Sequence, residues 1–105
     1  MAVDGGTERA FATLAPYRDG AIYVGHYSGS SEWERHPNGD EIVMVLEGST
    51  TVVLKEAEAN VEVHLAAGEM VVVPRNTWHR FVGSNNLKVM TVTPQPTDHN
   101  LEDPA

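Results

Sequence analysis

The stretch from Glu34 to Glu41 reads Glu-Arg-His-Pro-Asn-Gly-Asp-Glu, and Gly48 follows after six more residues. The proline, asparagine, glycine and aspartate in its middle favour a turn between two extended segments. Glu34 and His36 are two residues apart, so they share one face of an extended chain. Glu41 lies at an odd spacing from His36, but the turn resets the phase before the next strand begins. The stretch therefore predicts strand, turn and strand, with imidazole and carboxylate groups gathered near the turn.

A second stretch of the same character begins at Gly68 and, after five residues, reads Pro-Arg-Asn-Thr-Trp-His from Pro74 to His79. Its turn residues place His79 at the beginning of another extended segment. Two imidazoles and two carboxylates suit a divalent transition metal, which would also neutralise two glutamates that otherwise repel each other. The predicted ion is a divalent transition metal such as Fe, Mn, Ni or Zn. Its predicted ligands are Glu34, His36, Glu41 and His79.

The rest of the chain is typical of short β-strands. Seven segments are rich in β-branched and aromatic residues or alternate with period two: 21–27, 41–46, 50–54, 61–65, 70–73, 78–82 and 87–93. Turn residues separate them at the spacing that favours an all-β sandwich or barrel. Ser84-Asn85-Asn86 predicts a tight hairpin between the last two segments.

Both ends of the chain differ from this pattern. The segment from Thr7 to Leu14 is the one candidate for a short helix, with Thr7 as its cap. Residues 1–19 are therefore expected to form an N-terminal arm or short helix, and residues 20–94 the core of the barrel. Residues 95–105 contain little apolar surface and are expected to lie over the barrel or to fray.

Composition limits the classes of function. The 105 residues correspond to a single domain, and the absence of cysteine excludes disulfides, thiolate metal ligands and cysteine nucleophiles. Seven basic and fifteen acidic side chains give a net charge of −8, which argues against nucleic acid or an anionic membrane as a partner. The apolar runs are too short to span a bilayer, and no signal peptide is evident. A cytoplasmic protein with a small-molecule ligand is expected.

The first stretch resembles the first motif of the cupin superfamily. That motif consists of a glycine, a histidine-x-histidine pair, a glutamate three or four residues later, and a glycine after six more. Glu34-Arg35-His36 stands at the position of the histidine pair, Glu41 follows after four residues, and Gly48 ends the motif. Gly29 is one residue out of the usual leading position.

The second stretch resembles the second cupin motif, a glycine, five residues, proline-x-glycine, two residues and a histidine. Gly68, Pro74 and His79 match, and Asn76 replaces the middle glycine. Asparagine is the best substitute where the backbone needs a positive φ. The remaining histidines of the barrel and tail lie outside both motifs and are expected at the surface: His26, His64 and His99.

The resemblance implies an all-β fold, the cupin double-stranded β-helix or jelly-roll barrel, over roughly residues 20–94. It also implies a metal held by three histidines and one glutamate. His36, Glu41 and His79 carry over directly, whereas Glu34 carries over only by position, because it replaces the first histidine. Glu34 is expected to be the fourth ligand. Alternatively Glu34 does not bind the metal itself but hydrogen-bonds to one of the ligands or acts as a general base. The metal is then held by two histidines and one carboxylate, with open coordination positions.

The cupin resemblance does not select one reaction, because the fold hosts many. The first hypothesis is a metal-dependent enzyme, a dioxygenase, isomerase or lyase, that acts on a small oxygen-bearing molecule with Glu34 as the catalytic residue. The second is a non-catalytic module that binds or senses a sugar or small acid. The third is a structural metal. Small cupins often pair as dimers, so a homodimer that uses the segment before Pro16 is also expected.

Overall fold

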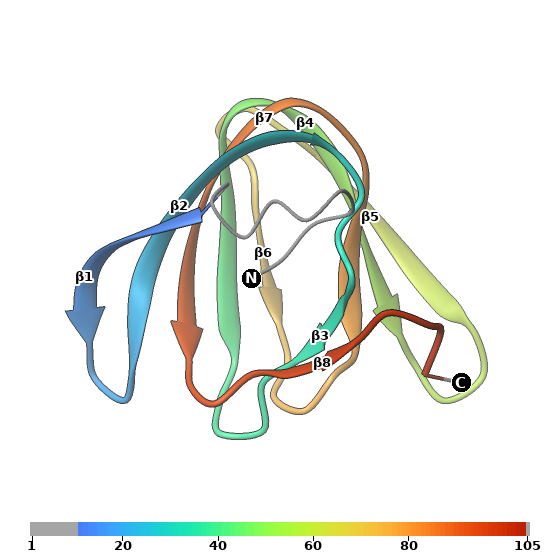
Figure 1. Cartoon of the computed structure of the whole chain (residues 1–105). Helices are drawn as coiled ribbons and strands as arrows, with labels where there is room; N and C mark the ends of the chain where they lie inside the picture. The colour runs from blue at the N-terminus through green and yellow to red at the C-terminus, as the bar shows by residue number, and fades with distance from the viewer. Residues whose placement is uncertain (1–10, 105) are drawn as a thin grey trace.

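The computed structural model describes residues 11–104, and these residues form eight β-strands (Figure 1). The strands are β1 (Phe11–Tyr17), β2 (Gly20–Gly29), β3 (Trp33–Arg35), β4 (Glu41–Lys55), β5 (Asn60–Ala66), β6 (Met70–Val73), β7 (His79–Pro94) and β8 (Asp98–Asn100). They curl into one barrel, so the prediction of an all-β barrel is confirmed. The described residues contain no helix long and apolar enough to cross a membrane.

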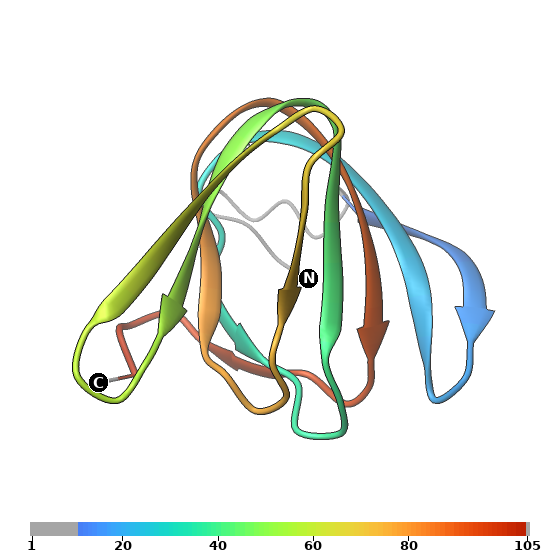
Figure 2. The same cartoon turned by 180° about the vertical axis from the view of Figure 1, so that it is seen from behind.

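Two long strands, β4 and β7, run antiparallel to each other through both walls of the barrel. Their pairing extends from Ile42 opposite Val92 to Leu54 opposite His79. The first half of β4 also pairs with β6 and its second half with β5, while β2 pairs with the second half of β7. Figure 2 shows one wall with β6, β4, β7, β2 and β1 side by side.

The long strands bend sharply at the top of the barrel in Figure 1, and Gly48 permits that bend. Its φ is +76°, and a Cβ atom at this position would lie 2.3 Å from the Asn86 carbonyl oxygen. The register between β4 and β7 shifts three times between Val45 and Thr51. Such bulges increase the local twist and let one strand pass from one wall to the other.

This bend corrects two predictions about strand boundaries. Residues 41–46 and 50–54 belong to one strand, β4, rather than to two. The hairpin predicted at Ser84-Asn85-Asn86 is wrong, because these residues lie inside β7. Gly83 and Asn86 adopt φ angles of 60° and 45°. Left-handed residues serve bulges as well as hairpin turns, so the same sequence chemistry bends the strand here without reversing it.

The helix predicted from Thr7 to Leu14 is also wrong where the structure describes it. Residues 11–14 belong to β1, which pairs with β2, and residues 7–10 lie outside the described residues. A single helical turn is marginal in water, whereas an edge strand gains a ladder of hydrogen bonds and a packed side chain. The Phe11 ring lies 5.5 Å from the Tyr27 ring, over the space that Gly25 leaves open.

The interior of the barrel changes from apolar to polar along the strands. The apolar part is a cluster of ten buried side chains: Tyr27, Val43, Val45, Val52, Leu54, Leu65, Val73, Phe81, Leu87 and Val89. At the start of β4 and the end of β7 the inward positions become polar. Glu41 precedes Val43 in the same phase, and Thr91 and Thr93 follow Val89.

The segment after β7 packs against the polar end of the barrel. Residues 98–100 form β8, which pairs with β3 in the register Arg35 opposite Asp98 and Trp33 opposite Asn100. The prediction that residues 95–105 lie over the surface or fray therefore holds only in part. A short polar strand can pair here because β3 offers an otherwise open edge, and an ion pair between Arg35 and Asp98 joins the two strands.

Candidate metal centre

The strand β3 and the turn after it direct Glu34 and His36 into the barrel. Both side chains are buried, with exposures of 2% and 3%. Arg35 lies between them in the opposite phase, and its guanidinium group lies 4.5 Å above the Trp78 ring. This alternation follows from the period of an extended chain, as the spacing of the two residues predicts.

The turn between β6 and β7 brings His79 to the same place. Glu34 and His79 are directly opposite each other in the pairing of β3 with β7, so their side chains share a face. Asn76 has a φ of 62°, which confirms the positive φ predicted where it replaces glycine. Its N–H donates to the His36 carbonyl oxygen at 2.9 Å, and the Arg75 N–H donates to a carboxylate oxygen of Asp40 at 2.8 Å. These hydrogen bonds join the turn of the second motif, at Arg75 and Asn76, to the turn of the first motif, at His36 and Asp40.

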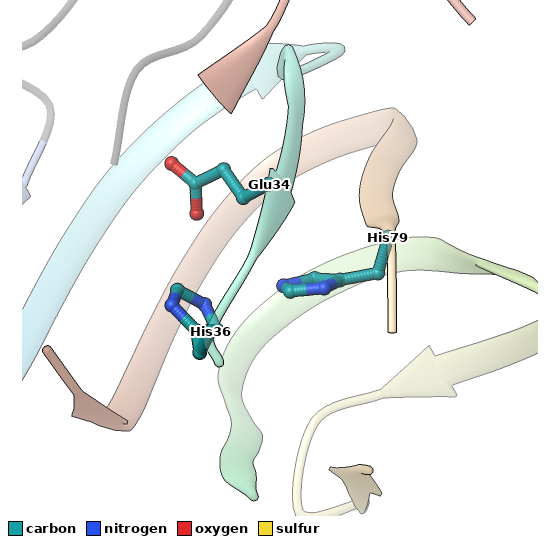
Figure 3. Close-up of side chains that lie close together, drawn as sticks. All are labelled: Glu34, His36 and His79. Carbon is teal, nitrogen blue, oxygen red and sulfur yellow. The ribbon is translucent and has the colours of Figure 1, made fainter. Parts of the chain in front are cut away.

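The structure brings all four predicted residues together. The side chains of Glu34, His36 and His79 converge, and one ligand atom from each lies within 4.8 Å of the others (Figure 3). Glu41 is fully buried beneath the two rings. Its Oε1 atom is 3.0 Å from His79 Nε2, and its Oε2 atom is 3.3 Å from His36 Nε2.

The histidine Nε2 atoms are the ring atoms that face the carboxylates. His79 Nδ1 lies 2.9 Å from the Thr77 carbonyl oxygen, and because a carbonyl only accepts, Nδ1 carries a proton. His79 Nε2, His36 Nε2 and Glu41 Oε1 are buried and, although His79 Nε2 and Glu41 Oε1 lie 3.0 Å apart, none of the three makes a well-aligned hydrogen bond with the described residues. A buried polar atom without a partner is costly unless something else binds it. Two imidazole nitrogens and carboxylate oxygens around one point fit a divalent transition ion.

The two glutamates have opposite electrostatic environments. Burial raises the pKa of Glu34 to about 8, and the charge of Glu41 adds to that rise. Burial would also raise the pKa of Glu41, but hydrogen bonding and charge from His36 and His79 outweigh it and lower that pKa to about 2. For His79 burial is the largest single influence and lowers the pKa, but the contributions of Glu41, the Thr77 carbonyl and Glu34 together raise it. Without a cation, Glu41 is therefore ionised at neutral pH and Glu34 is mostly protonated.

Sequence reasoning missed several residues that support this centre. Thr93 Oγ1 donates to Glu41 Oε2 at 2.5 Å, and Thr91 Oγ1 lies 2.9 Å from Thr93 Oγ1. Two threonines in the inward phase of an otherwise apolar strand were the available signal, because a buried hydroxyl needs a partner. Thr97 Oγ1 lies 3.0 Å from His36 Nδ1. Nothing in the sequence around Thr97 indicated this contact. His99, expected at the surface, is half-exposed and contacts Glu32.

The fold and the four converging side chains define a cupin barrel. The sequence profile of the cupin domain family matches residues 23–93. The YdbB protein of Bacillus subtilis strain 168 is 30% identical over 80 residues, which are 73% of this chain and 68% of YdbB. The chain therefore belongs to the cupin domain family.

Solved structures agree with this assignment. A cupin-2 domain protein from Shewanella frigidimarina has a TM-score of 0.67 and 25% identity, over 81% of this chain and 79% of the other. A hydroquinone 1,2-dioxygenase from Sphingomonas sp. TTNP3, with 4-hydroxybenzoate bound, has a TM-score of 0.71 and 15% identity, over 87% of this chain and 68% of the enzyme. At such low identity the second comparison shows the shared fold alone.

Proposed function

We propose that this protein binds a divalent transition metal through Glu34, His36, Glu41 and His79 and acts as a metal-dependent enzyme on a small oxygen-bearing molecule. The observation that carries the metal is the convergence of buried donor atoms that no well-aligned hydrogen bond among the described residues satisfies: His36 Nε2, His79 Nε2 and Glu41 Oε1. When bound, such an ion acts as a Lewis acid for substrate oxygens or, if it is iron, as a site for dioxygen.

Glu41 and Glu34 have different parts in this proposal. Glu41 is held in place by the Thr93 hydroxyl and stays ionised, so it provides the permanent negative charge beside the two histidines. Glu34 has a pKa of about 8, close to the range in which a carboxyl group can both give and take a proton at neutral pH. It can therefore serve as a ligand when ionised and as a proton carrier toward a substrate hydroxyl.

The place of Glu34, a buried carboxyl group beside two histidines that is mostly protonated without a cation, favours an enzyme over a module that only binds its ligand. A general acid or base is most effective when its pKa lies near the working pH, and binding alone does not require this. The alternative is a non-catalytic cupin that captures a sugar or small acid. Fold similarity to a hydroquinone 1,2-dioxygenase supports aromatic diols as the first substrates to try.

Metal content of the untagged protein tests the first part of the proposal. Elemental analysis should find close to one transition metal ion per chain in the wild type, and a strongly reduced content in His36→Ala and His79→Ala. His64→Ala is the matched control, because His64 bonds to Thr51 on the exposed side of the sheet. Equal metal content in all four proteins contradicts the proposed centre.

Turnover tests the second part. Oxygen uptake by the Fe2+-loaded protein should be measured with hydroquinone, and thermal stability with 4-hydroxybenzoate. In an enzyme, Glu34→Gln lowers turnover at least tenfold while the protein retains metal. Stabilisation by a ligand without oxygen uptake or any other product would instead favour the binding module.

We also propose that two copies of the chain pair through the outer face of the wall seen in Figure 2. Two uncharged rows cross its five strands: Ala12, Val24, Met90, Met44 and Met70, and beside them Ala15, Ile22, Val92, Ile42 and Val72. Copies with a net charge of −8 repel each other, and an uncharged face lets them approach at the lowest electrostatic cost. The rows include part of the segment before Pro16 that the sequence assigned to the dimer.

Light scattering tests this pairing. Val72 is 48% exposed, so Val72→Lys should convert a dimer into a monomer without disturbing the core. The added lysine reduces the net negative charge of each copy, so dissociation would reflect the cost of burying a charge in the apolar face rather than a larger overall repulsion between the copies. Leu101→Lys is the control, because Leu101 is 79% exposed outside these rows. A monomeric wild type, or a dimeric Val72→Lys, contradicts the proposed pairing.

A further inference from the structure

Residues 95–100, which we name the strap, follow β7 and run along β3 at the end of the barrel that holds the candidate metal centre (Figure 1). The strap begins at two backbone anchors. Asn38 Nδ2 donates to the Gln95 carbonyl oxygen at 2.8 Å, and the Gln95 N–H donates to the Asp19 carbonyl oxygen at 3.2 Å. The strap lies beyond the part of the chain that the cupin profile matches.

Alternation along the strap matches alternation along β3. Asp98 faces outward and accepts from Arg35, with Nε at 3.0 Å and the nearer terminal nitrogen at 2.9 Å. Thr97 and His99 have the opposite phase and reach the residues on either side of Arg35, namely His36 and Glu34. A slip of one residue would exchange the two sets of contacts. The register of this small ribbon therefore decides which strap residues face the metal centre.

The Thr97 hydroxyl contacts the His36 ring at Nδ1. Its hydroxyl donates its single proton to Gln95 Oε1 at 3.0 Å, and the Gln95 Nε2 group donates to the Tyr23 hydroxyl at 2.8 Å. With that proton used, the Thr97 oxygen can only accept from His36 Nδ1, which lies 3.0 Å away. The Nδ1 atom of His36 then carries a proton, and the Nε2 lone pair faces Glu41 and His79.

His99 contacts the other candidate ligand on β3. It lies directly opposite Glu34 in the pairing of β8 with β3. Its Nδ1 atom is 2.5 Å from Glu32 Oε1 and 3.5 Å from Glu34 Oε2. The strap therefore touches both Glu34 on β3 and His36 just after β3.

We propose that the strap is a positioning element of the metal centre, and that Thr97 is the positioning residue that fixes His36 with Nε2 directed at the ion. This inference rests on the proposed metal-binding function. The hydrogen bond behind a ligating histidine sets its tautomer and ring orientation, and its loss lowers metal affinity by about 10- to 100-fold. Removal of the Thr97 hydroxyl should therefore weaken metal binding although Thr97 contributes no atom to the ion.

Nitrogen-15 NMR of the imidazoles in the metal-free wild type tests the tautomer without any substitution. The His36 ring should carry its proton on Nδ1. A His36 ring with an unprotonated Nδ1 overturns the proposal. This measurement does not depend on metal binding, so it separates a failure of the strap from a failure of the proposed function, which would show as a wild type that binds no Zn2+.

Zn2+ affinity of two Thr97 variants, measured by competition with a chelator, tests the consequence. Thr97→Val keeps the branched shape and removes the oxygen, so Zn2+ affinity should fall about tenfold and the Nδ1–H tautomer of His36 should lose its preference. Thr97→Ser retains the hydroxyl and should restore both. Thr51→Val is the matched control, since the Thr51 hydroxyl contacts His64 instead of a candidate ligand. Wild-type affinity in Thr97→Val overturns the proposal.

Discussion

Two buried glutamates face the same pair of histidines, yet the regions that hold them differ. Glu41 begins a long central strand, accepts a hydrogen bond from Thr93 and lies within 3.3 Å of both Nε2 atoms. Glu34 lies on a three-residue strand between β7 and the strap. Burial penalises ionisation in both places, and only Glu41 receives enough compensation to remain charged. The same residue type thus forms a fixed anion in one region and a mostly protonated carboxyl group in the other.

The largest expected effect comes from removing the fixed anion. In the metal-free protein, Glu41→Gln should lower the free energy of unfolding at pH 7 by about 3 kcal/mol, from a pKa lowered from 4.5 to about 2. The folded state binds fewer protons than the unfolded state in this window, so this stability is present above pH 4.5 and is lost as the pH falls toward 2. Urea unfolding at several pH values checks this, and equal stabilities at pH 7 would contradict it.

Glu34→Gln should change the free energy of unfolding in the opposite direction to Glu41→Gln. The pKa of Glu34 is raised from 4.5 to about 8, so the folded state keeps a proton that the unfolded state loses. Stability of the metal-free wild type therefore falls as the pH rises from 4.5 to 8. The neutral amide should raise the free energy of unfolding by roughly 2 kcal/mol at pH 7, less than the full linkage value because the amide is also buried. The same urea experiment checks the sign, and a destabilised Glu34→Gln at pH 7 would remove the contrast between the two glutamates.

Sequence patterns were sufficient for the parts of this centre that depend on local geometry. The spacing of Glu34 and His36 placed both on one face, and the position of Asn76 in its motif predicted a positive φ. The contrast between Glu34 and Glu41 was not predictable, because it depends on which groups surround each carboxylate after folding. The contact between Thr97 and His36 joins residues 61 positions apart. No local periodicity carries such information, and the low apolar content of residues 95–105 predicted only a segment that lies over the barrel or frays.

The misread bend at Ser84-Asn85-Asn86 has a different cause. Asparagine tolerates left-handed backbone conformations that occur both in hairpin turns and in bulges. A hairpin turn reverses the chain, whereas a bulge leaves it paired with the same neighbouring strand. Here β4 continues alongside β7 through its own bend at Gly48, so the asparagines form a bulge. Only the pairing of the two long strands distinguishes the alternatives.

The pH dependence of metal affinity sharpens the comparison further. Binding of a cation should displace the proton of Glu34, and this proton alone should raise the apparent Zn2+ affinity by about tenfold per pH unit until the pH reaches about 8. Glu34→Gln lacks this proton and should show a smaller slope, whereas the proton that His79 releases, its pKa being raised as well, contributes equally in both proteins. Competition with a chelator at fixed ionic strength, with the chelator's own protonation corrected, measures both slopes. Identical slopes in the two proteins would mean that Glu34 is not the displaced group.

The smallest expected effect comes from substituting Thr93, the residue that donates a hydrogen bond to Glu41. Thr93→Val removes the hydroxyl that donates to Glu41 Oε2 and should lower the free energy of unfolding at pH 7 by about 1.5 kcal/mol, the lower end of the range for a hydrogen bond to a charged group. Thr91→Val is a nested control, because it leaves the bond from Thr93 to Glu41 in place while it removes the one between the two threonines. Urea unfolding should rank wild type, Thr91→Val and Thr93→Val in order of decreasing stability. If Thr91→Val is the less stable variant, the threonine pair supports the packing of β7 rather than the charge of Glu41, and the histidines alone must keep that carboxylate ionised.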